Sequence, residues 1–369
     1  SFATTASGKR PSLFVFYPFH NLACKDYIVW QKTPNSLTTD DVNETKLHAP
    51  ILQAGMSSSY LMFNSNPQCN LFNIHKGNLD PFGTVQINST LVAIKDEVIF
   101  DCIGSTLEVR NLQGTVKETM SMPAPGKFLC INGRYLCIIS EDYSIMLYDV
   151  QRRSPKLQFT TLFTTDYETI RIRNLSLSCG GFCLSISIDF FKDGNWYPSP
   201  NLYLHSPQFD KTVSVMFEGR IPKCHRWDSE DSRLLCVEAI PYDLNYESQV
   251  SDTFVFPLFV ADSLESFKQA HLKLDSDLEE IWYVELPRIY HSKPQDKPVG
   301  TVLPQFEGLN NADESSKKAL MELNFHLATG NIDAAFNAIR GIDNKATWRS
   351  LAQTCAQMRR IDLADLCFG

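Results

Sequence analysis

The chain has 369 residues and a net charge of −8, with 34 Lys and Arg residues against 42 Asp and Glu residues. A chain of this length can bury a sizeable core and usually forms two domains. The acidic balance argues against a protein that binds nucleic acid, which needs a basic surface. No apolar run approaches the roughly 20 residues of a membrane span, so we expect no direct insertion into a membrane.

The 11 cysteines lie mostly in apolar, strand-like contexts, as at Cys130 and Cys236. A thiol in such a context behaves as a small hydrophobic side chain. An odd number of cysteines does not suit a disulfide framework, so we expect a reducing compartment. The chain opens at Ser1 and stops at Gly369 in mid-pattern, and we therefore expect a fragment of a longer protein.

Residues 1–308 consist of short runs that are typical of β-strands throughout. The first four runs are expected to supply parts of two blades of a β-propeller. They are Leu13–Tyr17, Tyr27–Trp30, Tyr60–Phe63 and Leu71–Ile74.

The clearest repeating unit has four runs separated by turn signals at Asn132-Gly133, Glu141-Asp142 and Gln151–Pro155. Its third run ends in Tyr148-Asp149, where a WD repeat often carries its namesake dipeptide. The four runs are Phe128–Ile131, Arg134–Ile139, Ser144–Asp149 and Leu157–Leu162.

The same four-strand scheme recurs before and after this unit, at a spacing of roughly 40 to 55 residues that is typical of propeller blades. The predicted strands are, upstream, Gly83–Ile87, Leu91–Ile94, Thr106–Arg110 and Val116–Met120, then, downstream, Arg171–Leu177, Phe182–Ile188, Asn201–His205 and Thr212–Phe217, and in a further copy Lys223–Asp228, Arg233–Ile240, Phe254–Val260 and Phe267–Leu274.

A last blade begins with Ile281–Leu286 and Ile289–His291, and Val299–Phe306 could supply its outer strand. We predict a mainly β fold, a seven-bladed WD-type β-propeller over residues 1–308. In it a strand near Leu13 completes the blade that begins near Ile281, which would remove an exposed sheet edge. A pair of β-sandwiches is the alternative.

Residues 309–369 are predicted to be helical and to begin a TPR-like array. Lys317–Ala328 has apolar residues at helical spacing, Gly330 can adopt the left-handed conformation that ends a helix, and Asn331 can cap the next one. The pattern after Asn331 returns at Arg360, 29 residues later. Because one such hairpin cannot bury its apolar face alone, it must pack on a neighbour. Two coincidental amphipathic hairpins are the alternative.

Motifs that carry catalysis or bind cofactors are absent from the sequence, which has no phosphate-binding loop, no dinucleotide-binding turn and no nucleophile elbow. The pairs Cys179/Cys183 and Cys224-His225 lack the spacing of a zinc site. The acidic clusters at Asp228–Asp231 and Asp275–Glu280 fall at turns, where solvated carboxylates are ordinary, and lack the pattern of a calcium loop. We therefore predict no enzyme, and no catalytic, cofactor-binding or metal-binding residue.

Three tryptophans are interpreted as core residues, not binding hot spots. Trp227 and Trp282 fall in predicted inner strands, and Trp348 lies in a predicted helix from Lys345 to Met358.

From about Ile221 to Gly369 the sequence resembles one family, the WD-repeat and TPR subunit of about 140 kDa of intraflagellar transport complex A. The resembling segments are His225–Asp228, Leu286–Pro294, Leu303–Leu309, Phe325–Phe336, Lys345–Trp348, Ile361–Ala364 and Leu366–Gly369. Before Ile221 the resemblance is one of architecture. Phe368, Asn337 and Asn344 depart from the residues expected there.

The resemblance implies the second propeller and first helical repeats of a non-catalytic scaffold. It implies retrograde ciliary transport, ciliary entry of membrane cargo, and a location in the cilium, the basal body and the cytoplasm or cytoskeleton. The expected partners are the other subunits of complex A and membrane-cargo adaptors. A vesicle-coat or tethering subunit with the same plan is one alternative, and a propeller hydrolase is another.

Overall fold

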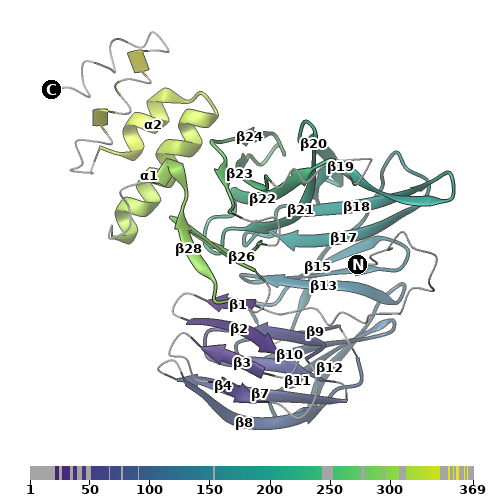
Figure 1. Cartoon of the computed structure of the whole chain (residues 1–369). Helices are drawn as coiled ribbons and strands as arrows, with labels where there is room; N and C mark the ends of the chain where they lie inside the picture. The colour runs from purple at the N-terminus through teal and green to yellow at the C-terminus, as the bar shows by residue number, and fades with distance from the viewer. Residues whose placement is uncertain are drawn as a thin grey trace, which may run out of the picture. The chain divides into compact units, whose positions relative to one another are not determined.

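The computed structural model describes most of the chain between residues 21 and 340 and helical positions beyond it (Figure 1). The described residues are 21–24, 27–33, 36–39, 44–46, 51–65, 67–75, 78–89, 91–152, 154–242, 252–275, 279–293, 296–306, 313–340, 348, 349, 352, 355, 356, 361 and 364. Among these residues, no helix has the length and apolar character needed to cross a membrane.

The chain divides into two compact units, one of residues 1–164 and 292–298 and the other of residues 165–291 and 299–369. The strands of the first unit are β1 (Asn21–Cys24), β2 (Tyr27–Thr33), β3 (Ser36–Thr39), β4 (Glu44–Lys46), β5 (Gln53–Met56), β6 (Tyr60–Asn64), β7 (Gln68–His75), β8 (Asn78–Gln86), β9 (Leu91–Lys95), β10 (Val98–Ile103), β11 (Thr106–Asn111), β12 (Val116–Ser121), β13 (Gly126–Asn132), β14 (Tyr135–Ser140), β15 (Ser144–Asp149) and β16 (Lys156–Leu162).

These strands form four antiparallel sheets of four strands each, β1–β4, β5–β8, β9–β12 and β13–β16. In the last of them every predicted strand is found, and Gly133 takes the left-handed conformation (φ 56°) that its tight turn requires. The middle strands β14 and β15 are buried along nearly their whole length. Strands covered on both faces are continuously apolar, and this is why their sequences are easy to recognise.

The second unit contains the remaining strands and the helices. They are β17 (Ile170–Leu177), β18 (Leu184–Lys192), β19 (Asn195–Ser206), β20 (Lys211–Met216), β21 (Arg220–Trp227), β22 (Leu234–Pro241), β23 (Phe254–Val260), β24 (Ser266–Lys268), β25 (Leu272–Lys273), β26 (Glu280–Glu285), β27 (Arg288–Ser292), β28 (Val299–Val302), a short 3₁₀ helix (Pro304–Phe306), α1 (Glu314–Ala328) and α2 (Ile332–Ala338).

The strands β17–β20 form a four-stranded sheet, β21–β25 a five-stranded one and β26–β28 a three-stranded one. The predicted outer strand Phe267–Leu274 is divided between β24 and β25, which pair with successive parts of β23. Both sheets with four or more strands have the plan of a propeller blade, since consecutive strands pair in order.

The prediction of seven blades is wrong. Over the described residues six blades are complete, and β26–β28 is a sheet of three strands only. The reason lies at the other end of the chain, where β1–β4 pair with one another through short connections. Such local closure costs less chain entropy than pairing with a strand far along the sequence. The fold is a six-bladed β-propeller followed by a short helical segment, and the strand expected near Leu13 lies outside the described residues.

One predicted blade boundary is also wrong. The sequence pattern groups Gly83–Ile87 with Leu91–Ile94 in one blade, but Gly83–Ile87 lies largely in β8 and pairs with β7 of the preceding blade. The strand that completes the later blade is β10, which was not predicted. Its run Val98–Ile103 includes Asp101, an acidic residue that is fully buried and interrupts the apolar pattern.

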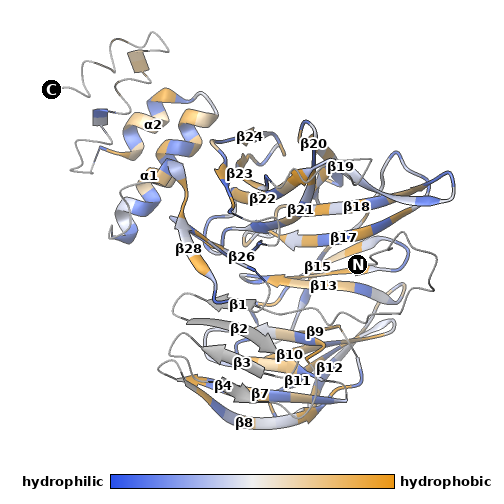
Figure 2. Ribbon diagram, viewed as in Figure 1, coloured by the Kyte–Doolittle hydropathy of each residue, from blue (hydrophilic) through white to orange (hydrophobic). Residues whose placement is uncertain are grey.

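The two helices follow from local signals that the sequence carries. Helix α1 begins one turn earlier than predicted because Asp313 caps it, accepting a hydrogen bond from the Ser316 backbone N–H at 3.0 Å. As predicted, Gly330 is left-handed (φ 75°) and Asn331 caps α2 through the Ala334 N–H. Hydrophobic and hydrophilic residues alternate along α1 (Figure 2), so one face of the helix is available for packing.

Candidate interaction site at the blade–helix junction

A shared hydrophobic core joins the blade β21–β25 to β26–β28 and the helices. Phe259 on β23 and Phe306 of the 3₁₀ helix are at most 1% exposed, as are Met321 on α1 and Ala335 on α2. Phe259 also meets Phe325 of α1 edge to face, with the ring centroids 6.1 Å apart. The hairpin therefore buries its apolar face against the preceding blade, as its sequence requires.

Arg233, just before β22, fixes the orientation of α1 on the blade. Its guanidinium donates two hydrogen bonds to Glu322 of α1, at 2.7 and 3.1 Å, and two to Asp231, at 2.7 and 3.0 Å. It also lies over the ring of Phe325, 4.6 Å from the centroid. Paired guanidinium–carboxylate bonds of this kind are directional as well as strong. Arg233 with Asp231 and Glu322, called the Arg233 clamp below, therefore fixes the angle at which α1 packs on the blade.

The ion pair between Arg233 and Glu322 stabilises the charged form of each side chain. The hydrogen bond from Arg233 lowers the pKa of Glu322. Burial acts to lower the pKa of Arg233, but the bonds to Asp231 and Glu322 outweigh it and raise that pKa above its usual value. Both groups are therefore held in their charged forms.

Asp228, at the end of β21, ties two turns of the unit together. One carboxylate oxygen accepts from the backbone N–H of Glu230 at 3.0 Å and of Asp231 at 2.7 Å, and the other accepts from Leu286 at 2.9 Å. Asp228 is 1% exposed, and burial raises its pKa to about 6, although the three N–H donors act in the opposite direction. The expectation that this carboxylate is solvated is wrong.

A second ion pair links β21 and β22 to β26. The Lys223 ammonium lies 3.0 Å from Glu238 and 3.4 Å from Glu280. The other oxygen of Glu238 accepts from the backbone N–H of Ile281 at 3.1 Å. Glu238 is fully buried, and burial raises its pKa. A buried carboxylate is costly unless it is paired and hydrogen-bonded, and both conditions hold here.

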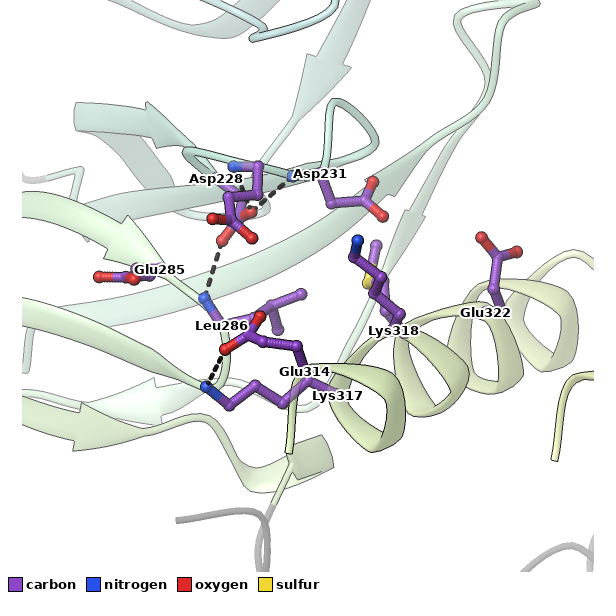
Figure 3. Close-up of a pocket in the computed structure, with 10 residues that line it drawn as sticks. Asp228, Asp231, Glu285, Leu286, Glu314, Lys317, Lys318 and Glu322 are labelled. Carbon is purple, nitrogen blue, oxygen red and sulfur yellow. Dashed lines mark hydrogen bonds and ion pairs between the residues drawn. The ribbon is translucent and has the colours of Figure 1, made fainter. Parts of the chain in front are cut away.

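A cavity of about 170 Å³ opens between the Asp228 turn and the first turns of α1. Figure 3 shows carboxylates on both of its sides, Asp228 and Asp231 from the blade and Glu314 and Glu322 from the helix. The Glu314 carboxylate is paired with Lys317 at 2.9 Å, and Glu322 and Asp231 are held by Arg233. Of these acidic groups, Glu322 joins α1 to the blade through Arg233, and Glu314 pairs within α1.

A serine, a histidine and a tryptophan form a buried chain of hydrogen bonds between β18 and β21. The Ser185 hydroxyl lies 2.7 Å from Nδ1 of His225 and accepts from Nε1 of Trp227 at 3.1 Å, and Ser187 lies 3.3 Å from Nε2 of the histidine. A serine and a histidine at this distance could act as nucleophile and base. However, Ser185 and His225 are both 0% exposed, so no substrate reaches them. These hydrogen bonds instead join the blade of β18 to the blade of β21.

The cysteines of the two candidate metal clusters are mostly buried. Cys183 and Cys224 are buried, and burial raises the pKa of both thiols, that of Cys224 to about 11. Cys179 is partly exposed, and burial raises its pKa to about 12. Such thiols are poor ligands and nucleophiles. Over the described residues, no group of three or more His, Cys, Asp or Glu side chains could hold a metal ion.

The tryptophans agree in part with their interpretation as core. Trp227 is 4% exposed and packs edge to face on Phe182. Trp348 packs against the shared core and meets Phe336 edge to face at 5.6 Å. Trp282 is only half-buried.

The residues that build the junction were missed at the level of sequence. Arg233 and Glu322 are 89 positions apart, and no local pattern predicts such a pair. Asp228 offered a partial signal, because an aspartate followed by two turn residues commonly accepts from their N–H groups. Its third bond, to Leu286, depends on the neighbouring sheet.

Two sequence families match the chain. The family described as "IFT140 second beta-propeller" matches residues 25–218, which is more than half of the chain. A second family, described as the TPR domain of IFT140 and IFT172, matches residues 330–369. The first match covers β2–β20, and the second begins just before α2.

Several solved propellers are distantly similar. KlHsv2 with loop 6CD replaced by a Gly-Ser linker is 14% identical, with 69% of this chain and 84% of that chain covered and a TM-score of 0.49. Hsv2 of Kluyveromyces lactis is 12% identical, with 69% and 85% covered and a TM-score of 0.47. The Cps50 (Swd1) β-propeller domain of Myceliophteria thermophila is 13% identical, with 60% and 79% covered and a TM-score of 0.45. TM-scores below 0.5 add nothing to the argument about function.

Proposed function

Because the chain belongs to the IFT140 family, we propose that it is a non-catalytic scaffold segment of intraflagellar transport complex A. In this proposal residues 1–308 form the propeller and residues 309–369 begin the TPR-like array. The chain acts in the cilium, at the basal body and in the cytoplasm or cytoskeleton. Its partners are the other subunits of complex A and membrane-cargo adaptors, and it supports retrograde transport and the ciliary entry of membrane cargo.

The observation that carries the proposal is the junction between two domains of the family. The Arg233 clamp and the core around Phe259 join α1 to the last complete blade. A scaffold must present two binding surfaces in a defined relation, and a helical array that leaves the blade at a fixed angle meets this requirement.

The absence of catalysis is part of the proposal and has its own test. Ser185 and His225 are the pair that could support hydrolysis, and their burial argues that they do not. A fluorophosphonate probe for activated serines should leave the folded protein unlabelled, and labelling of Ser185 would contradict the proposal.

The role in complex A is tested by recovery and by rescue. The tagged chain, expressed in ciliated cells, should recover other complex A subunits, whereas recovery of vesicle-coat subunits in their place would contradict it. Full-length protein should also restore retrograde transport in cells that lack it. The same protein carrying Phe259→Ala should restore retrograde transport poorly, because α1 loses its main packing contact with the blade. The measurement is the accumulation of train proteins at the ciliary tip.

The matched control for this rescue is Phe100→Ala, which removes a phenyl group of the same size from the core around β10. Equal failure of the two variants would show that the rescue responds to lost stability in general. A selective failure of Phe259→Ala, at equal protein levels, supports the role of the junction.

A further inference from the structure

The strand β16 is an open sheet edge of seven residues, Lys156–Leu162. It pairs with β15 on one side and is last in the sheet order β13-β14-β15-β16. Leu157 is 47% exposed and Leu162 is 51% exposed. A row of unpaired N–H and C=O groups beside exposed apolar side chains is a template for another strand.

The other blades of the first unit protect their edges. The last strand of β1–β4 has only three residues, Glu44–Lys46. The edge strand β8 contains Pro81 and a bulge at the residue after it, and β12 carries the adjacent charges Lys117 and Glu118. Short strands, prolines, bulges and charges are the devices by which proteins prevent pairing at an edge.

The second unit also protects its edges. Lys268 donates to the carbonyl of Met216 at 2.5 Å, at the end of the edge strand β20. The edge strands β24 and β25 have three and two residues, and β28 has four. Against these, β16 has one charge, at Lys156, and a bulge near its start, after which Phe159–Leu162 pair regularly with β15. Among the outermost strands of the described blades, β16 is therefore the longest that has neither a proline nor a second charge.

The register shows which backbone groups point outward. The Phe163 N–H donates to the Tyr143 carbonyl at 3.1 Å, so Phe163, Thr161 and Phe159 face β15. Because alternate residues of a strand face opposite ways, Thr160 and Leu162 turn their N–H and C=O groups away from the sheet. No backbone hydrogen bond from another described segment engages these two residues.

We propose that β16 is a docking edge that binds an extended segment of a partner protein as an added antiparallel fifth strand. The backbone of Thr160 and Leu162 supplies the hydrogen bonds, and Leu157 and Leu162 select a segment with apolar or β-branched side chains. Lys156 is the only charge on the strand, so an acidic residue near the C-terminal end of the incoming segment completes the match. A second copy of β16 would bring no carboxylate to Lys156 and fits less well.

The test uses an acetylated peptide of alternating valine and threonine with glutamate at its C-terminal end. At a concentration ten times its Kd, the peptide should slow amide hydrogen exchange of Thr160 and Leu162 by about tenfold. The outward amides of Thr119 and Ser121 on β12 provide the internal control and should not change. Absence of protection at millimolar peptide, or equal protection of β12, would overturn the proposal.

Three variants separate edge pairing from other causes. Thr160→Pro removes an outward N–H that the sheet does not use and should weaken peptide binding by roughly tenfold. Thr160→Ala keeps that N–H and should bind as the wild type does. Leu162→Lys retains every backbone group and adds a protecting charge, so it should weaken binding even if the proline variant folds poorly.

Two results would overturn the assignment of the partner. Equal binding by Thr160→Pro and the wild type would show that the peptide lies elsewhere. A dimer in analytical ultracentrifugation that Thr160→Pro abolishes would place a second copy of the chain on this edge.

Discussion

The blades β13–β16 and β21–β25 share one pairing scheme but differ in what surrounds it. The first keeps its core within strands, and its outermost strand is open along the described residues. The second extends its core into α1 and α2 and buries Glu238 and Asp228 at its margin. A blade that packs against a further element thus adds specific polar contacts to its apolar packing.

The largest effect should come from the shared core. Phe259→Ala should destabilise the protein by about 3–5 kcal/mol, because it removes a fully buried ring and leaves a cavity. Phe100→Ala should cost a similar amount in its own blade. The comparison is decided by amide hydrogen exchange in α1, which should rise strongly in the Phe259 variant only. A rise of equal size in both variants would show that the helices do not depend on the junction.

The next effect concerns the helical hairpin itself. Ala335 of α2 is fully buried in the shared core. Ala335→Phe should therefore destabilise the protein by on the order of 1–3 kcal/mol through overpacking. Ala334→Phe on the same helix, at a half-buried position, is the control and should cost less. Thermal unfolding measures both, and unchanged stability of Ala335→Phe would contradict the helix pairing.

The comparison also explains what the sequence could predict. In β13–β16 the residues Leu136–Ile139 are all buried, so a continuous apolar run and the turn at Asn132-Gly133 were sufficient. The helix cap at Asn331 was equally local. The number of complete blades was not local, because it depends on whether the strands before Lys46 pair with one another or with strands after Glu280.

The candidate site was predictable to a much smaller degree. Asp228 looked like an ordinary turn residue, and only its contact with Leu286 shows why it is buried. Arg233 and Glu322 each have an unremarkable local sequence, and their pairing depends on how α1 returns to the blade. The protection of a sheet edge is also a comparative property, since β16 has a single charge at its first residue whereas β12 has two adjacent charges within the strand.

Removal of the clamp should have a moderate effect. Arg233→Ala should destabilise the protein by about 1–2 kcal/mol, since the side chain is partly exposed yet makes paired bonds to Glu322 and packs on Phe325. The matched control is Arg134→Ala in β13–β16. Arg134 also pairs with an aspartate, Asp149 at 3.3 Å, and lies over a ring, but it is half exposed, so its loss should cost no more than about 0.5 kcal/mol.

Chemical denaturation measures both arginine variants. Arg233→Lys adds a second comparison, because it keeps the charge but loses the paired guanidinium hydrogen bonds. It should recover less than half of the stability that Arg233→Ala loses. Equal effects of Arg233→Ala and Arg134→Ala would mean that the clamp is no more than a surface ion pair.

The last effect is a dependence of stability on pH, and it has opposite signs in the two blades. Burial raises the pKa of Asp228 from 3.8 to about 6, so the folded state binds more protons than the unfolded state between these values. The contribution of Asp228 to stability therefore falls as pH rises from about 4 to 6 and is level above, with a slope of at most about 1.4 kcal/mol per pH unit. In β13–β16, a hydrogen bond from Ser140 lowers the pKa of Asp142. The contribution of Asp142 is complete above about pH 4 and is lost as pH falls further.

Denaturation from about pH 3 to pH 7 should separate these two carboxylates. The destabilisation by Asp228→Asn should shrink as pH rises from about 4 to 6, because the wild-type protein loses its stabilising proton there. The destabilisation by Asp142→Asn should stay constant over the same range and shrink only at lower pH. A constant difference for Asp228→Asn across the whole range would mean that its three N–H donors balance its burial and leave its pKa unshifted.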